Sequence, residues 1–279
     1  MVTVALARPG FVETPEARLH YLLWQPDAPR ARIVLLHGLE SHSAWFTDLG
    51  PRLAALGHIV IAIDRPGAGR SGGPRGDAGP MQGLFGYLRL VLGAVSPPLP
   101  TYLIGFSWGA RWALAQAIRH PGDARGVVMM APGLHLLTTY SPMRRSAILA
   151  TALCRPATRM PTPVREHEWF TTRPAPLAFI QSDPWRLSRV TSRLLLRSWL
   201  LERVYSRRAH VLRIPLLHLM GGRDRICDNR RNRRLLQRAA GTGLYAEHLY
   251  ADADHALMFE CDRYPIADDI ATWIAASAS

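Results

Sequence analysis

The first half of the chain alternates short apolar runs with amphipathic stretches. Continuous apolar runs of this length are typical of strands that are covered on both faces of a sheet. They occur at residues 32–37, 58–64, 101–106 and 126–131, and residues 17–24 alternate as a half-buried strand does. Helical periodicity fills the intervals, at residues 45–56, 83–95 and 108–120. Strands that alternate with helices in this way predict a mostly parallel α/β sheet.

The pattern changes at residue 134. Residues 134–213 show helical periodicity and several prolines without a clear buried strand. The strand signal resumes at residues 214–220 and 244–250, and each of these strands precedes a predicted helix, at residues 229–240 and 262–276. We therefore expect one α/β core made of residues 1–133 and 214–279, with a mainly helical insertion, residues 134–213, placed over it.

The composition is that of an ordinary globular protein. Of the 279 residues, 48% are apolar and 20% are charged, which excludes a disordered, collagen-like or coiled-coil chain. No apolar run approaches the roughly 18 residues of a membrane span, and the first 25 residues lack the pattern of a secretory signal. Three cysteines, a small and odd number, argue against a disulfide framework, and no Cys/His pair has zinc-ligand spacing. We expect a cytoplasmic protein without a bound metal.

The basic charge is concentrated in one segment. All 34 basic residues are arginine, and the net charge is +13. Residues 134–213 contain 14 Arg and four Asp or Glu, so they carry +10 of this charge. A GC-rich genome favours arginine in general, but a local excess is typical of a surface that meets an anionic partner. No nucleic-acid-binding motif or array of base-stacking aromatic residues accompanies it, so we expect no nucleic acid.

The strongest motif is GFSWG at residues 105–109, which has the form Gly-x-Ser-x-Gly. It follows a predicted strand and directly precedes a predicted helix, which puts Ser107 on a sharp turn where a substrate carbonyl can reach it. The glycines suit a turn at which side chains would clash. The N–H groups of the new helix favour a developing negative charge. This context predicts that Ser107 is a catalytic nucleophile, and the alternative is a Gly-rich turn of a doubly wound fold.

A nucleophilic serine needs a base, and the base needs an acid that orients it. His255 follows the strand at 244–250 and Asp224 follows the strand at 214–220. Because α/β sheets place their sites at these carboxyl ends, we predict that His255 is the base and Asp224 the acid. Asp224 is preferred because it is the first acid beyond its strand. The rivals for the acid are Asp228, Asp252 and Asp254.

Two backbone N–H groups are candidates for an oxyanion hole, which stabilises the negative oxygen of a tetrahedral intermediate. A tight turn after the strand at 32–37 can direct the N–H of Leu39 at this oxygen, and Trp108, the residue after the nucleophile, supplies the second N–H. His37 is interpreted as a residue that holds the turn. Residues 65–80 hold six Gly and three Pro and are predicted to form a loop. Their spacing is not that of a phosphate-binding GxGxxG, so no nucleotide cofactor is expected.

These segments resemble the α/β-hydrolases, and within them the monoacylglycerol lipases and lysophospholipases of the serine aminopeptidase S33-like group. HGLESHSAWF (37–46) is similar to that group's HGxGEHS, and DRPGAGRS (64–71) to its DxxGHGxS. GFSWGA (105–110) is similar to GHSMGG, and also to the GGSWG of proline iminopeptidases. GGRDRICD (221–228) is similar to the stretch that holds the catalytic Asp, which in some members also contains a cysteine, as Cys227 here. The departures include Glu40 in place of a glycine.

The resemblance implies an α/β-hydrolase fold, with a mostly parallel central sheet, helices on both faces and a helical lid formed by residues 134–213. At 100° per residue, five arginines of this lid fall within an arc of about 120° on a helix that is apolar elsewhere. They are Arg189, Arg193, Arg197, Arg203 and Arg207. Such a helix can lie on an anionic membrane surface, which would make the protein peripheral to the membrane. The alternative is a face of solvated arginines.

The sequence therefore predicts a serine hydrolase that cleaves carboxylic esters through a Ser-Asp-His triad and an acyl-enzyme. Esters of the monoacylglycerol or lysophospholipid type are the expected substrates, and no metal or organic cofactor is required. One alternative is an aminopeptidase or amidase on the same triad, for which an acidic cluster near the pocket would hold the substrate amine. The other is a non-catalytic binding protein of the same fold.

Overall fold

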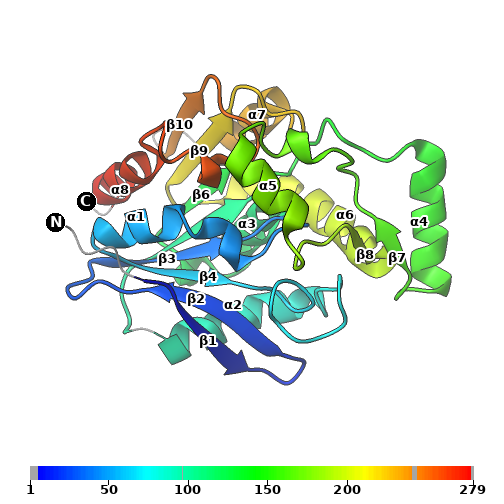
Figure 1. Ribbon diagram of the computed structural model, residues 1–279, viewed down its shortest axis with the longest axis horizontal. Helices are drawn as coiled ribbons and strands as arrows, with labels where there is room; N and C mark the ends of the chain where they lie inside the picture. The colour runs from blue at the N-terminus through cyan, green and yellow to red at the C-terminus, as the bar shows by residue number, and fades with distance from the viewer. Residues whose placement is uncertain (1–5, 96, 241–243, 278–279) are drawn as a thin grey trace.

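A central sheet organises the molecule. The structure, a computed structural model, describes residues 6–95, 97–240 and 244–277, and in these ranges eight strands form the sheet, in the order β1-β2-β4-β3-β5-β6-β9-β10 (Figure 1). β2 pairs antiparallel with β1 and β4, and the pairs from β4 to β10 are parallel. The strands are β1 (Arg8–Glu13), β2 (Arg18–Trp24), β3 (Ala31–Leu36), β4 (His58–Ile63), β5 (Thr101–Phe106), β6 (Gly126–Met130), β9 (Leu216–Gly221) and β10 (Tyr245–Tyr250).

The strands predicted from the apolar pattern are present, and their ends agree within two residues. The predicted mostly parallel α/β sheet is therefore confirmed. Strand β1 was missed. It lies at the edge of the sheet, its residues RPGFVE are exposed or half-buried, and it contains Pro and Gly, so no apolar run marks it.

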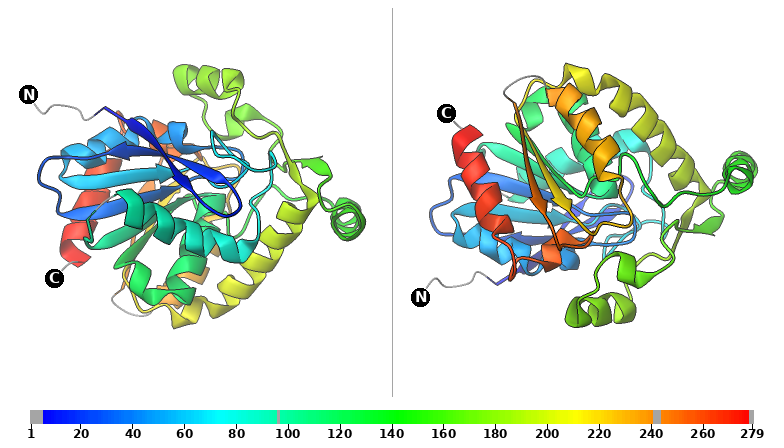
Figure 2. Two further views of the ribbon diagram at one scale, coloured as in Figure 1. Left: turned by 90° about the horizontal axis from the view of Figure 1, so that it is seen from below. Right: turned by 90° about the horizontal axis from the view of Figure 1, so that it is seen from above.

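Helices cover both faces of the sheet, as Figure 2 shows. Helices α1 (Leu49–Ala55) and α8 (Ile266–Ser277) pack on one face against Ile33 and Leu35 of β3. Helices α2 (Met81–Val95), α3 (Trp108–Arg119) and α7 (Asn229–Ala240) pack on the other, against Val34 and Leu36. Successive side chains of a strand point to opposite faces, so a continuous apolar run serves both layers. The helix predicted at 262–276 begins only after Pro265, whose ring disfavours a helical preceding residue.

The segment expected to be a helical insertion, residues 134–213, runs between β6 and β9. It contains α4 (Pro142–Cys154), α5 (Pro174–Ser182) and α6 (Ser192–Arg208). A small antiparallel sheet of β7 (Arg159–Pro161) and β8 (Arg189–Thr191) was not predicted, because each strand has only three residues. Leu194 and Leu195 of α6 pack into the cluster formed by α2 and α3. Helix α4 stands away from the sheet at one end of the molecule (Figures 1 and 2).

The prediction of one arginine face on the insertion is wrong for three of its five residues. Arg189 lies on β8, before α6 begins, and donates to the carbonyl of Arg159. Arg193 forms an ion pair with the buried carboxylate of Asp77, and Arg197 donates to the carbonyl of Gly79 at 2.5 Å. Arg193 and Arg197 therefore fasten α6 to the Gly-rich loop of the core. A helical wheel gives the direction of a side chain but not the partner it meets there.

The turn after β4 depends on a buried carboxylate. Asp64 accepts hydrogen bonds from the N–H groups of Ser43 at 2.6 Å and Arg70 at 2.9 Å, and His20 Nδ1 of β2 donates to it at 2.8 Å. Burial alone would raise the pKa of Asp64, but the bonds from His20 and Ser43 are among the contacts that lower it to about 2. The ionised carboxylate thus joins β2, β4 and the loop that precedes α1.

This carboxylate is expected to stabilise the fold above about pH 4 and to lose that effect as the pH falls towards 2, because its pKa is lower in the folded protein than in the unfolded chain. Asp64→Asn is expected to lower the free energy of unfolding by about 2 kcal/mol at pH 7, measured by urea denaturation. The control is Asp48→Asn, which removes an exposed pair with Arg52 and is expected to cost less than about 1 kcal/mol. Equal losses in the two variants would contradict this role.

Candidate active site

Ser107 occupies a strained turn between β5 and α3. Its φ of +51° and ψ of −113° are unusual for a residue with a side chain and cost about 1–3 kcal/mol, so the surroundings must hold this conformation. The Ser107 N–H donates to the carbonyl of Met130 at 3.0 Å, and the Ser107 carbonyl accepts from Gly133 at 2.9 Å. The neighbouring strand β6 and the residues after it therefore fix the turn and leave the hydroxyl in a cavity.

The two glycines of the motif are required by close packing around this turn. A Cβ at Gly105 would lie 2.5 Å from the Cα of Ala110, and a Cβ at Gly109 would lie 2.0 Å from the carbonyl oxygen of Leu36. Both neighbours are backbone atoms, which cannot move aside as the end of a side chain can. Helix α3 can therefore start directly beside β3 and β5 only with glycine at both positions.

Asp224 and His255 lie together, as their positions after β9 and β10 predict. His255 Nδ1 donates to Asp224 Oδ2 at 2.8 Å, and neither side chain is exposed. The second oxygen, Oδ1, accepts from the N–H groups of Ile226 at 2.8 Å and Cys227 at 2.9 Å, which fixes the carboxylate. A proton held on Nδ1 by the carboxylate leaves Nε2 as the basic nitrogen. Nε2 is buried and has no hydrogen-bond partner among the described residues.

The other acids considered for this position bind elsewhere. Asp228 accepts from the backbone N–H of Arg231 at 3.0 Å and so caps the start of α7. Asp252 pairs with Arg223 at the surface. Asp254 accepts from the N–H of Thr172 at 2.6 Å and from its hydroxyl at 2.7 Å. Asp224 is thus the carboxylate that the structure brings to His255.

The His255 ring is screened from water by two phenylalanines. Its centre lies 5.0 Å from that of Phe106 in β5 and 6.0 Å from that of Phe170 in the insertion. Both phenylalanines and Ser107 line a cavity of about 890 Å³. Phe170 is one of several aromatic residues in residues 134–213, and the sequence gives no sign that it meets His255, because this contact depends on how that segment folds.

The backbone N–H groups of Leu39 and Trp108 are available to a ligand. Both residues line the cavity with Ser107, and neither N–H has a hydrogen-bond partner in the described part of the chain. Free N–H groups beside a nucleophile can stabilise an oxyanion. The arrangement therefore suits the predicted oxyanion hole.

A buried arginine that the sequence analysis missed holds this loop. Arg65 is 1% exposed, and its guanidinium donates to the carbonyls of Gly38 at 2.8 Å and Leu39 at 2.5 Å. The same group lies 4.9 Å from the centre of the Trp108 ring. The Arg65 N–H donates to His37 Nε2 at 3.2 Å, in agreement with the interpretation of His37 as a residue that holds the turn. Burial lowers the pKa of Arg65 to about 9. Two charged residues in succession, Asp64 and Arg65, directly after a fully buried strand are the signal that could have drawn attention to it.

Asp224, Cys227 and His255 also bring three ligand-type atoms within 4.8 Å of one another. A zinc site requires the thiolate form of cysteine. Burial, and then the nearby Asp224 carboxylate, raise the pKa of the Cys227 thiol well above its ordinary value, and the thiol donates to the carbonyl of Ala131 at 3.3 Å. All three groups have partners among the described residues, since Asp224 binds His255 and two backbone N–H groups and the thiol donates to Ala131.

The chain matches known proteins over nearly its whole length. The family model described as serine aminopeptidase, S33, matches residues 27–262. A monoacylglycerol lipase of Mycolicibacterium smegmatis is 27% identical in an alignment that covers 98% of this chain and 99% of that protein. A monoglyceride lipase of Homo sapiens is 26% identical over 96% of this chain and 90% of its own. The solved structure of a soluble variant of monoglyceride lipase from Saccharomyces cerevisiae has a similar fold, with a TM-score of 0.84 and 19% identity over 99% of this chain and 97% of its own.

The contacts of Asp224 and Asp228 predict different effects of removing each charge. Asp224→Asn is expected to lower kcat for a short p-nitrophenyl ester by about 10⁴, because the amide no longer holds His255 in the required tautomer. Asp228→Asn is the matched control, since Asn also caps helices, and it is expected to change kcat less than about threefold. A larger loss of kcat in the Asp228 variant than in the Asp224 variant would show that Asp224 is not the acid.

Proposed function

The chain belongs to the serine aminopeptidase S33 family and is a carboxylic ester hydrolase of the α/β-hydrolase fold, and from this premise we propose that it cleaves single-chain lipid esters of the monoacylglycerol or lysophospholipid type. Ser107 is the nucleophile, His255 the base and Asp224 the acid. Two observations support the proposal: the buried Asp224–His255 pair with a free Nε2, and a strained Ser107 that lines the cavity together with Phe106, whose ring lies against that of His255.

The geometry supports an acyl-enzyme reaction in two halves. Ser107 Oγ attacks the ester carbonyl, and its proton passes to His255 Nε2, while Asp224 stabilises the charged ring. The Leu39 and Trp108 N–H groups bind the tetrahedral oxyanion. Collapse breaks the bond to the alcohol, which leaves with the proton from His255. Water then repeats the sequence on the acyl-enzyme and releases the carboxylic acid and the free serine.

The walls of the cavity support a lipid acyl chain. Its volume of about 890 Å³ lies within the usual range of ligand pockets. Much of the lining comes from apolar side chains of the insertion: Leu134, Leu136, Leu149, Val164, Leu195, Leu196, Trp199 and Leu200. A single acyl chain can bury its methylene groups against such a wall, at about 0.8 kcal/mol for each group.

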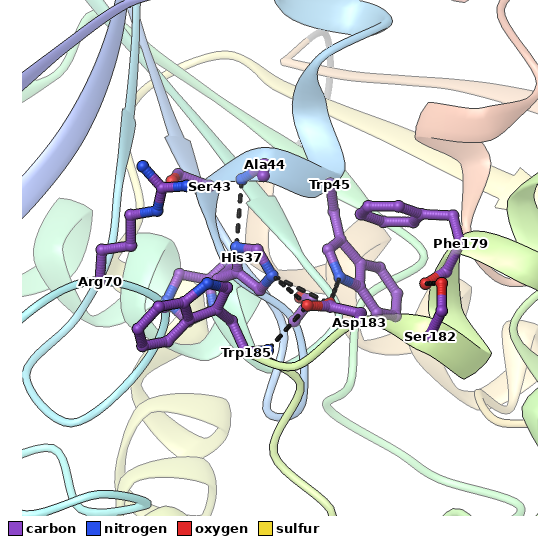
Figure 3. Close-up of polar contacts among 12 residues, drawn as sticks. His37, Ser43, Ala44, Trp45, Arg70, Phe179, Ser182, Asp183 and Trp185 are labelled. Atoms are coloured by element: carbon purple, nitrogen blue, oxygen red, sulfur yellow. Dashed lines mark hydrogen bonds and ion pairs between the residues drawn. The ribbon is translucent and has the colours of Figure 1, made fainter.

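The acids near the cavity do not favour an aminopeptidase. Asp183 accepts from Trp45 Nε1 and from His42 Nε2, each at 2.9 Å, and Figure 3 shows its carboxylate against Trp45. Glu202 pairs with the buried Arg111 at 3.0 Å. Glu40 pairs with Arg186 at 2.7 Å, and burial raises its pKa to about 7. Glu166 and Glu168 do not line the cavity. Carboxylates that are already paired offer little to a substrate amine.

The exposed side chains of helix α4 favour a lid role for the insertion, in which it contacts a lipid surface. It stands away from the sheet (Figure 1), and Met143 and Leu153 are 82% and 72% exposed. Arg144 and Arg145 lie on the same helix, and apolar residues with arginines suit an anionic interface. Leu149 of α4 also lines the cavity, so an acyl chain could pass from the interface to Ser107. This surface replaces the arginine face first expected on α6. None of the helices in the described ranges is long and apolar enough to span a membrane.

Ser107→Ala is expected to abolish hydrolysis of a monoacylglycerol, with a loss of about 10³-fold or more in kcat, because the acyl group then has no nucleophile to accept it. Fatty acid release is measured, and an unchanged melting temperature shows that the fold is intact. Ser146→Ala is the control, since Ser146 also lines the cavity. Hydrolysis that survives in Ser107→Ala would place the reaction at another residue and defeat the proposed function.

Binding of α4 to lipid is tested with the double variant Met143→Ser/Leu153→Ser and vesicles that contain anionic lipid. Cosedimentation is expected to weaken by about tenfold or more, since each side chain contributes on the order of 1.5 kcal/mol when fully buried. Turnover of a soluble ester is expected to stay the same. The control is Leu249→Ser, which changes a residue of β10 that is 54% exposed. Vesicle binding that is equal in both variants would contradict a role for α4.

A further inference from the structure

Three arginines on one wall of the cavity have no assigned role. Arg203 and Arg207 come from the last turns of α6, and Arg231 comes from the first turn of α7. All three line the cavity that contains Ser107 and are exposed to solvent. Over the described ranges of the chain, none of the three guanidinium groups has an ion pair or a hydrogen bond. We refer to Arg203, Arg207 and Arg231 as the arginine wall.

The carboxylates that line the cavity are already paired with cations. Arg111 pairs with Glu202 at 3.0 Å and donates to the carbonyl of Gly133 at 2.6 Å. Glu40 pairs with Arg186. The carboxylates that line the cavity therefore have cations of their own, and the arginine wall keeps its positive charge.

Two packing contacts bring the members of the wall together. Helix α7 packs against the turn Ala209–Val211, which directly follows α6, so the end of one helix lies beside the other (Figure 2). The backbone of His135 is held to α7, where its N–H donates to Asn232 Oδ1 at 2.7 Å. Burial, and then the charge of Arg231, lower the pKa of His135, while Glu202 raises it. Arg231 and Glu202, which belongs to the second half of α6, thus both lie near enough to His135 to influence its charge, and His135 lines the same cavity.

The contrast within α6 separates this wall from an ordinary basic surface. Arg193 and Arg197, in the first half of the helix, are bound to the core loop through Asp77 and Gly79. Arg203 and Arg207, one turn apart in the second half, face the cavity without partners. Guanidinium groups bind phosphate and carboxylate oxygens through paired hydrogen bonds, and several of them together favour an anion.

We propose that the arginine wall binds an anionic group on the alcohol part of the ester, so that the enzyme prefers acylglycerol phosphates to neutral monoacylglycerols. This inference rests on the proposed function, because it concerns the substrate of the same Ser107. The acyl chain occupies the apolar part of the cavity. The alcohol part of a single-chain lipid is therefore the part that can bear a negative charge next to the arginine wall. The phosphate takes no part in the bond changes, and it positions the ester carbonyl at Ser107.

The test compares 1-butyrylglycerol with 1-butyrylglycerol 3-phosphate, which are short enough to stay monomeric and so remove any effect of a lipid surface. The wild-type enzyme is expected to have a kcat/KM about tenfold or more higher for the phosphate ester, with the difference mainly in KM. Raising the salt concentration should reduce this preference, since salt screens exposed charges. Equal kcat/KM values for the two esters would overturn the proposal while the proposed function stands.

The variant Arg203→Gln/Arg207→Gln/Arg231→Gln should lose the preference and leave hydrolysis of the neutral ester within about threefold. The control is Arg208→Gln/Arg230→Gln/Arg234→Gln, which removes the same charge from exposed residues that do not line the cavity. An equal loss in the control would show general attraction of anions and overturn the wall as a site. A glycerol hemisuccinate, which carries its charge on the acyl side, is expected to gain nothing, and a gain for it alone would refute the assignment to the alcohol part.

A second measurement does not depend on folding of the triple variant. Glycerol 3-phosphate is expected to be a competitive inhibitor of 1-butyrylglycerol hydrolysis by the wild-type enzyme. Glycerol at the same concentration is expected not to inhibit. Inhibition by neither compound would contradict the proposed anion site. Failure to hydrolyse either ester would instead count against the proposed function, so the two failures are distinguishable.

Discussion

The chain has to turn from β5 into α3 within a single residue, and most of the candidate site depends on this constraint. At Ser107 the backbone adopts a positive φ, which the carbonyl of Met130 and the N–H of Gly133 hold in place. Ser107 and Trp108, the first residue of α3, both line the cavity, and a turn of this kind presents a hydroxyl and the next N–H to one side. The turn also brings α3 so close to β3 that only glycine fits at position 109. The proposed nucleophile and one proposed oxyanion donor therefore depend on one backbone geometry.

Buried charged side chains position the other parts of the candidate site. The Arg65 guanidinium binds the carbonyls of Gly38 and Leu39 and so holds the loop whose Leu39 lines the cavity with Ser107. Burying a cation is costly unless its donors find acceptors, and these carbonyls supply two of them. The buried Asp224 carboxylate is also fully hydrogen-bonded, since its oxygens accept from two backbone N–H groups and from His255. The charges of Arg65 and Asp224 are thus bound by backbone groups. The arginine wall has no such partners among the described residues, which is why we propose a ligand for it.

The sequence was informative where chemistry follows from strand order. Ser107, Asp224 and His255 come directly after strands, and parallel strands bring their carboxyl ends to one edge, so the Asp–His contact could be predicted from β9 and β10. Contacts that join distant loops could not be predicted in this way. Arg193 appeared to be a surface residue on a helical wheel, but its partner Asp77 lies 116 residues away in a loop without regular structure. Edge strand β1 was missed for a related reason, because an exposed strand has no apolar run.

The proposed mechanism requires that Ser107 forms a covalent intermediate whose oxyanion is held by the Leu39 and Trp108 N–H groups. The most direct measurement is a crystal structure of the enzyme after reaction with a p-nitrophenyl alkylphosphonate, which mimics the tetrahedral intermediate. We expect phosphorus bonded to Ser107 Oγ and a phosphoryl oxygen about 2.7–3.1 Å from both nitrogens. A phosphonate on another residue, or an oxygen turned away from both N–H groups, would contradict it.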